Sequence, residues 1–249
     1  MSHVIFFVGL LFTSSFFSLN NGNFDHTFAK KETTSNNAYH PGIRDAALSF
    51  YNKLSDTDLN FDAFEKAYKG YLLLLKDQKI ENETYLTVVD MSASANQSRF
   101  FVIDMKNEKI ADKSMVAHGR NSGSEFAKEF SNKIGSYQTS LGFYKTAELY
   151  TGKHGLSLRL DGLENSNSNA RTRAIVIHAA DYVSEMFIKK NGRLGRSLGC
   201  PSLPQNQFKP IIQKIKEGSL LFIYHPTKSY LSNSKIINTS ESLLDRFNS

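Results

Sequence analysis

The apolar positions of residues 43–76 recur at the three- to four-residue spacing of amphipathic helices. We therefore predict two helices in this segment, with Asp58 or Asn60 as the cap of the second. We expect residues 41–82 to form a small helical element that serves packing. The apolar stripe of its second helix is wide, and it consists of Phe61, Phe64, Ala67, Tyr68, Tyr71, Leu72 and Leu75.

After residue 82 the pattern changes to short β-branched and aromatic runs that are separated by turn residues. Only residues 181–190 and 207–216 favour helices in this region, and Asp181 can cap the first of them. We therefore predict a β-rich domain of the α+β class over residues 83–226, followed by a polar tail over residues 227–249. The predicted strands cover residues 85–91, 99–105, 110–118, 141–150, 155–163, 174–178 and 219–224.

The N-terminal segment bears on the compartment of the protein. Residues 1–22 contain no charged side chain, and their apolar run over residues 4–12 is shorter than the ~20 residues that a spanning helix needs. This pattern favours a signal peptide over residues 1–22, a linker over residues 23–40, and export to the periplasm or cell envelope without a membrane span after cleavage. The alternative is a buried N-terminal strand or helix, because a basic start and an A-x-A cleavage motif are missing.

Composition excludes several classes of protein. Hydrophobic residues make up 40% of the 249 residues, which is enough for a core and argues against disorder. The net charge of +6 suits an anionic polymer as partner, but no basic cluster with a recognisable motif indicates a nucleic-acid partner. A single cysteine excludes an intrachain disulfide and C-x-x-C motifs. No cluster has the spacing of metal ligands, so we expect neither a metal nor another cofactor.

The one cysteine, Cys200, lies between Gly199 and Pro201. Glycine allows a tight turn and a close approach by substrate, and backbone N–H groups in such a turn can face an oxyanion. Arg193 and Arg196 lie shortly before it, and positive charge lowers the pKa of a thiol. By themselves these residues leave an inert buried thiol and a nucleophile equally open.

A thiol nucleophile needs a base, which is most often histidine. His178 follows the apolar run of residues 174–177, so we expect it at the end of a buried strand, where a rigid scaffold presents side chains to the adjoining loop. The alternative is a histidine that only caps a core strand.

Together, His178 and the later motif Ser197-x-Gly199-Cys200 resemble the L,D-transpeptidase catalytic domain of the YkuD-like fold. The sequence is most similar to the branch known as the murein L,D-transpeptidase catalytic domain family, from about residue 85 to about residue 225. The resemblance implies a YkuD-like β-sandwich with a small N-terminal helical element. The matching stretches are residues 99–104, 116–119, 140–144, 152–155, 173–178 and 195–201.

The resemblance also implies a mechanism and a substrate. Cys200 would attack the carbonyl of the third residue of a peptidoglycan stem peptide, His178 would transfer the proton, and the backbone N–H groups of Gly199 and Cys200 would hold the oxyanion. D-Alanine would leave, and an amine of a second stem would form a 3→3 cross-link. A wall-attached protein is another possible acceptor, and water as acceptor would make the protein an L,D-carboxypeptidase.

Four further residues are candidates for substrate binding, namely Arg196, Ser197, His118 and Tyr144. Arg196 can pair with a carboxylate of the stem, and its alternative is a surface charge.

The sequence departs from the wider family at Leu198, where many members carry histidine, and at Ser202, where many carry asparagine or arginine. The competing hypothesis is a noncatalytic wall-binding module, in which Cys200 is a bystander.

Overall fold

The computed structural model describes residues 42–56, 58–153 and 155–240. The predicted signal peptide and linker, His154, and residues 241–249 of the predicted tail lie outside the described residues. The elements are α1 (Ile43–Leu54), α2 (Phe61–Lys76), β1 (Tyr85–Asp90), β2 (Phe100–Asp104), β3 (Lys109–Ser114), β4 (Gly142–Gly152), β5 (Gly155–Gly162), β6 (Val176–Ala179), α3 (Glu185–Asn191), β7 (Ser202–Leu203), α4 (Gln205–Ile215), β8 (Leu220–Tyr224) and α5 (Lys228–Asn233).

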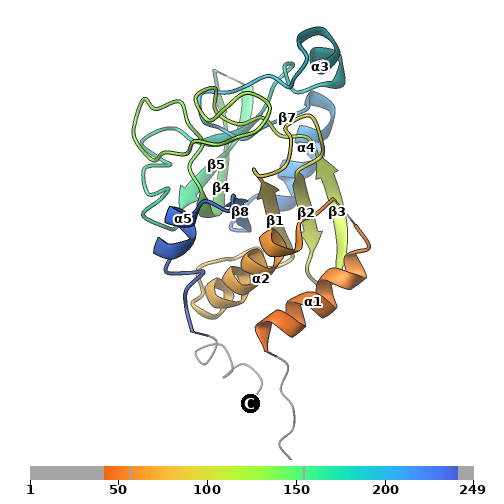
Figure 1. Ribbon diagram of the computed structural model, residues 1–249, viewed down its shortest axis with the longest axis vertical. Coiled ribbons are helices and arrows are strands. Elements are labelled where there is room, and N and C mark those ends of the chain that lie inside the picture. The colour runs from red at the N-terminus through yellow and green to blue at the C-terminus, as the bar shows by residue number, and fades with distance from the viewer. Residues whose placement is uncertain (1–41, 57, 154, 241–249) are drawn as a thin grey trace, which may run out of the picture. The chain divides into compact units, whose positions relative to one another are not determined.

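The strands form one eight-stranded sheet in the order β3-β2-β1-β8-β4-β5-β6-β7 (Figure 1). Most neighbours are antiparallel, whereas β1 with β8 and β6 with β7 are parallel. Strand β8 lies between β1 and β4 and is buried along its whole length, which explains why its sequence is apolar on both faces. The predicted β-rich α+β class is confirmed.

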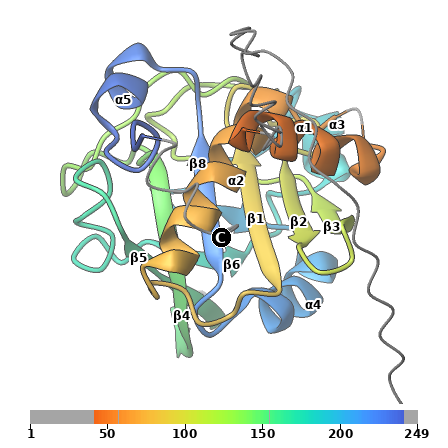
Figure 2. The same ribbon diagram turned by 90° about the horizontal axis from the view of Figure 1, so that it is seen from below.

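Helix α2 lies across one face of the sheet, over β1 and β8 (Figure 2). Asn60 caps it, because the Asn60 side chain accepts hydrogen bonds from the backbone N–H groups of Asp62 and Ala63. Gly70 lets the helix approach the sheet closely, since an added Cβ would lie 2.3 Å from the ring of Phe143. The predicted helix pair is confirmed. None of the helices in the described ranges is long and apolar enough to cross a membrane.

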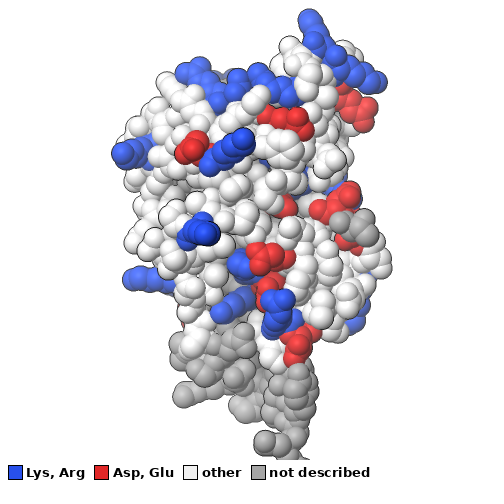
Figure 3. Space-filling model, in the orientation of Figure 1, with Lys and Arg blue, Asp and Glu red and all other residues white. Residues whose placement is uncertain are grey.

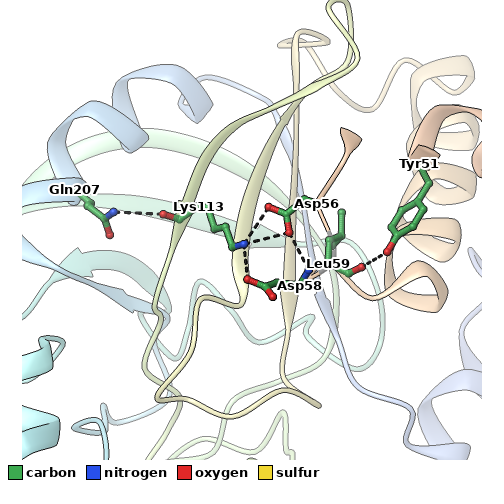
Figure 4. Close-up of polar contacts among 6 residues, drawn as sticks. All are labelled: Tyr51, Asp56, Asp58, Leu59, Lys113 and Gln207. Carbon is green, nitrogen blue, oxygen red and sulfur yellow. Dashed lines mark hydrogen bonds and ion pairs between the residues drawn. The ribbon is translucent and has the colours of Figure 1, made fainter. Parts of the chain in front are cut away.

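Polar contacts join the loop between α1 and α2 to strand β3 (Figure 4). Lys113 Nζ lies 3.1 and 3.0 Å from the two carboxylate oxygens of Asp56, and it also pairs with Asp58. The backbone carbonyl of Lys113 accepts a hydrogen bond from Gln207 of α4 at 3.3 Å. These contacts connect the helical element to the edge of the sheet.

Three elements differ from the sequence prediction. Helix α3 begins at Glu185 with Ser184 as its cap, rather than at Asp181. The two-residue strand β7 pairs with β6, and it is too short to have a recognisable period. Part of the predicted tail forms α5, whose Tyr230 packs in the main core. One buried residue in a polar segment is a weak signal of amphipathicity, so α5 could not be read from the pattern.

Candidate active site

The pairing of β6 with β7 brings together the two residues that the sequence singles out. The parallel register places His178 opposite Ser202, which lies two residues after Cys200. Cys200 is half-buried, and its Sγ lies 3.6 Å from the carbonyl oxygen of Ala174, just before β6. Ala174 adopts a positive φ of 51°, a left-handed turn that is unusual for a residue with a Cβ.

Both ring nitrogens of His178 have hydrogen-bond partners. Nδ1 lies 2.9 Å from the carbonyl oxygen of Ala179, and Nε2 lies 2.9 Å from Ser202 Oγ. A carbonyl only accepts, so we assign the proton of the neutral ring to Nδ1, and Nε2 then accepts from the Ser202 hydroxyl. Ser202 Oγ also lies 3.0 Å from Tyr182 Oη. Neither Ser202 nor Tyr182 could be assigned to the site from the sequence, because their contacts depend on the β6–β7 register.

The surroundings of Cys200 have opposing effects on its thiol. Burial raises the pKa of Cys200, while the Val176 backbone and the positive charges of Arg173 and Lys153 act in the opposite direction. The net direction is upward, so the thiol needs a base to become a nucleophile. The sequence favoured Arg193 and Arg196 as the charges that act on the thiol. In the structure, the positive charges that lower the pKa of Cys200 are those of Arg173 and Lys153.

The turn before Cys200 requires glycine at position 199. Gly199 has a φ of 127°, and an added Cβ would lie 2.9 Å from the carbonyl oxygen of Gln138. The Gly199 N–H donates to Ser197 Oγ at 3.0 Å, and Ser197 Oγ donates to the carbonyl oxygen of Cys200 at 2.6 Å. Ser197 therefore holds the turn together, and the Gly199 N–H has an acceptor inside the turn.

His118 and Tyr144, which the sequence offers as substrate-binding residues, are both buried. His118 Nδ1 lies 2.8 Å from a guanidinium nitrogen of the buried Arg99, and burial together with the Arg99 charge lowers the pKa of His118 to about 3. Tyr144 Oη donates to the Ser140 carbonyl at 2.9 Å. These residues stabilise the scaffold, since the His118 carbonyl also accepts from the N–H of Ser197 at 2.9 Å.

Arg173 is a supporting residue that the sequence did not reveal. Its guanidinium donates to the carbonyl oxygens of Ser131 and Gln138 at 2.7 and 2.5 Å. Its side chain thereby fixes the loop that passes close to Gly199, while its charge acts on Cys200. An isolated arginine before a predicted strand carries no signal of this role.

A large pocket of the described residues does not include the residues predicted from the sequence. It has a volume of about 880 Å³, and it lies between residues 128–132, residues 163–166 and the segment of α5. Within the part of the chain that the structure describes, no three His, Cys, Asp or Glu side chains gather closely enough to hold a metal ion.

The solved structures that match the chain are distant in sequence. An L,D-transpeptidase from Mycobacterium smegmatis matches with 12% identity and a TM-score of 0.36, over 57% of this chain and 59% of that chain. An L,D-transpeptidase from Stackebrandtia nassauensis matches with 13% identity and a TM-score of 0.35, over 74% and 78%. The helical cell shape determining protein Pgp2 from Campylobacter jejuni matches with 15% identity and a TM-score of 0.37, over 64% and 54%. The chain thus spans less than two thirds of the length of the mycobacterial protein.

Comparison at the level of sequence identifies the family of the chain. No protein of curated function matches it. The family model of the L,D-transpeptidase catalytic domain, however, matches residues 55–224. This range contains α2, the whole sheet and both His178 and Cys200. Because the match covers most of the chain and all of the strands, the protein belongs to the L,D-transpeptidase catalytic-domain family.

Proposed function

We propose that this protein is a cysteine-dependent L,D-transpeptidase, with Cys200 as nucleophile and His178 as general base. The observation that carries the proposal is the β6–β7 register, in which a hydrogen-bonded histidine lies beside the strand that follows the only cysteine. A base held next to a thiol is what nucleophilic acyl transfer requires.

In the first half-reaction, His178 takes the proton of the Cys200 thiol, and the thiolate attacks the carbonyl of the third stem residue. The tetrahedral intermediate collapses to a thioester as the C–N bond breaks, and His178 returns the proton to the departing D-alanine amine. The imidazolium has two N–H groups, which donate to the Ala179 carbonyl and to Ser202 Oγ. Ser202 can donate to the neutral ring and accept from the charged ring, so it stabilises both states.

The oxyanion needs a donor in the turn at Cys200. Because the Gly199 N–H donates to Ser197 Oγ, we assign this role to the Cys200 N–H and leave Gly199 the task of shaping the turn. A second hydrogen-bond donor to the oxyanion would have to be brought into place when the substrate binds.

In the second half-reaction, an amine of a second stem attacks the thioester and releases the Cys200 thiol, which gives the 3→3 cross-link. A wall-attached protein with a free amine is an alternative acceptor. Water at the same step gives an L,D-carboxypeptidase product. These outcomes share one acyl-enzyme and differ only in the nucleophile that reaches it.

The test is incubation with a purified tetrapeptide-containing muropeptide, followed by mass spectrometry. We expect the wild-type protein to release D-alanine and to form a cross-linked dimer, and the Cys200→Ala protein to form neither. Lys190→Gln, a change at an exposed residue of α3, is the matched control and should behave like the wild type. Release of free tripeptide without dimer would identify a carboxypeptidase, whereas binding without any product would favour the noncatalytic wall-binding module.

We also propose that the chain is exported and that residues 1–22 are its signal peptide. The apolar run at residues 4–12 supports this, and the mature protein should begin between residues 18 and 23. N-terminal sequencing of secreted protein tests it, and an intact Met1 on protein from the cytoplasm would contradict it.

A further inference from the structure

A small pocket beside the candidate active site has a strongly basic wall. Its volume is about 320 Å³, and it is lined by Arg120, Tyr182, Phe187, Arg193, Gly195 and Arg196. We call it the arginine pocket. Among the described residues, none of its three arginines forms an ion pair with a carboxylate. In Figure 3, Lys and Arg side chains gather along the edge of the molecule where α3 and the adjoining loops lie.

The guanidinium groups of the arginine pocket use only part of their hydrogen-bonding capacity. Arg196 Nη1 donates to the carbonyl oxygens of Arg120 and Gly123 at 3.1 and 2.8 Å, but the buried Arg196 Nε has no partner. Arg193 Nη1 donates to the carbonyl oxygen of the neighbouring Leu194 at 2.8 Å. A guanidinium has five donors, so several remain for a ligand.

The three positive charges oppose one another. Burial lowers the pKa of Arg196, and the charges of Arg193 and Arg120 lower it further. Buried or partly buried like charges are unfavourable unless an opposite charge compensates them. A hollow with this wall is therefore most stable when it holds an anion.

The arginine pocket adjoins the candidate catalytic residues through two independent connections. Tyr182, which lines it, lies 3.0 Å from Ser202 Oγ, and Ser202 lies 2.9 Å from His178 Nε2. Arg196 lies on the same loop as Cys200, four residues before it. A ligand that reacts at Cys200 thus has the arginine pocket within reach of its neighbouring groups.

We infer that the arginine pocket binds a carboxylate of the stem peptide and thereby positions the peptide for attack by Cys200. The inference rests on the proposed function for its substrate. Arginine forks match carboxylates with two parallel hydrogen bonds, and the pocket is too small for a polymer. Two carboxylates lie near the scissile bond of a stem, one at the C-terminal D-alanine and one on the side chain of a diamino acid that carries it.

The test is calorimetric binding of synthetic tetrapeptide stems to the full-length Cys200→Ala protein, which keeps the arginine pocket and stops turnover. One stem has both carboxylates free, a second has an amide at the C-terminus, and a third has an amide on the diamino-acid side chain. We expect one amide to raise Kd about 10- to 100-fold, which is the usual effect of losing a charge-assisted hydrogen-bonded pair. The amide that has this effect identifies which carboxylate the pocket binds.

Two arginine variants in the Cys200→Ala background complete the test. Arg193→Gln should raise Kd for the free acid about 10-fold or more and should remove most of the difference between acid and amide. Among the described residues, the Arg193 side chain donates a hydrogen bond to its neighbour Leu194 and forms no ion pair, so this change should leave the fold intact. Arg196→Lys keeps the charge but loses the fork and should also weaken binding. Lys190→Gln, which removes a nearby charge outside the arginine pocket, should bind like its parent.

The inference is overturned if no stem binds, if both amides bind as tightly as the acid, or if the acid–amide difference persists in Arg193→Gln. Turnover of muropeptide by the wild-type protein reports the proposed function separately. Selective binding of the acid without any product would leave the arginine pocket in place and refute the enzyme. Product formation together with equal binding of the acid and both amides would support the proposed enzyme and overturn the inference about the arginine pocket.

Discussion

Ser202 contacts both the proposed base, His178, and the neighbouring Tyr182. Its Oγ lies between Nε2 of His178 and Oη of Tyr182, at 2.9 and 3.0 Å, and its side chain is buried. A hydroxyl can change from donor to acceptor by rotating, so it can follow the protonation of the imidazole. We therefore regard Ser202 as a positioning residue for the proposed base.

Replacing Ser202 with Ala should slow the acylation of Cys200 by a carbapenem about tenfold, because the imidazolium loses an acceptor. Intact-protein mass spectrometry over a time course measures the rate of acylation. Ser202→Thr keeps the hydroxyl and should restore the wild-type rate, whereas an unchanged rate in Ser202→Ala would give Ser202 a packing role only.

The proposed nucleophile and base can be separated with the same reagent. Cys200→Ala should form no carbapenem adduct, because an unactivated hydroxyl such as that of Ser197 does not replace a thiol. His178→Ala should keep the thiol and slow acylation by ~10²–10⁴-fold. Because burial raises the pKa of Cys200, the residual rate of His178→Ala should rise with pH into the alkaline range. Adduct formation by Cys200→Ala at the wild-type rate would contradict the assignment.

At the scale of elements, the helix pair is attached to the sheet by charged as well as apolar contacts. Burial would raise the pKa of Asp56, but the hydrogen bond and charge of Lys113 outweigh it, and the net pKa is lowered. A lowered pKa means that this interaction stabilises the fold above the pKa of an unfolded aspartate. The stabilisation is lost as pH falls through the lower, folded pKa.

Asp56→Asn should therefore reduce the free energy of unfolding by about 0.5–1 kcal/mol near pH 7. The difference from the wild type should shrink as the pH falls through the lowered, folded pKa of Asp56, because the wild-type carboxylate then becomes protonated as well. Urea unfolding at several pH values measures it. Glu108→Gln removes one partner of the more exposed pair Lys53–Glu108 and should have a smaller effect, and an equal effect in both variants would argue against a special role for Asp56.

At the scale of the whole molecule, the chain returns to its core after the last strand. Tyr230 of α5 is buried in the main core, and its hydroxyl donates to Glu164 at 2.8 Å. The same carboxylate oxygen of Glu164 accepts from the backbone N–H of Phe143 in β4 at 2.9 Å. Glu164 thus connects the C-terminal helix to the middle of the sheet.

Tyr230→Ala should lower the free energy of unfolding by about 3 kcal/mol, because it removes a buried ring and leaves Glu164 without one donor. Thermal unfolding followed by circular dichroism measures the change. Ser232→Ala, at an exposed position of the same helix, is the control and should leave Tm nearly unchanged. A Tm of Tyr230→Ala within about a degree of the wild type would show that α5 is not part of the cooperative unit.

The helix pair, the long strands and the two chemically distinctive residues could all be predicted without coordinates. Periodicity is a local property: Phe61, Phe64 and Tyr71 repeat at helical spacing, and residues 220–224 are apolar without interruption, whatever else the chain does. Cys200 and His178 stood out because of their neighbours in the chain. Their shared family resemblance is likewise a property of ordered motifs along the sequence.

The partners of those residues were decided only by the tertiary structure. Ser202 meets His178 because β7 pairs with β6 in one register, and a shift by one residue would turn its side chain to the other face of the sheet. Arg120, Arg193 and Arg196 share one pocket, although a long stretch of chain separates the first from the others. The burial of His118 and Tyr144 likewise depends on what packs over them. Burial, register and distance between remote residues are set by the packing of the whole chain, and no local pattern encodes them.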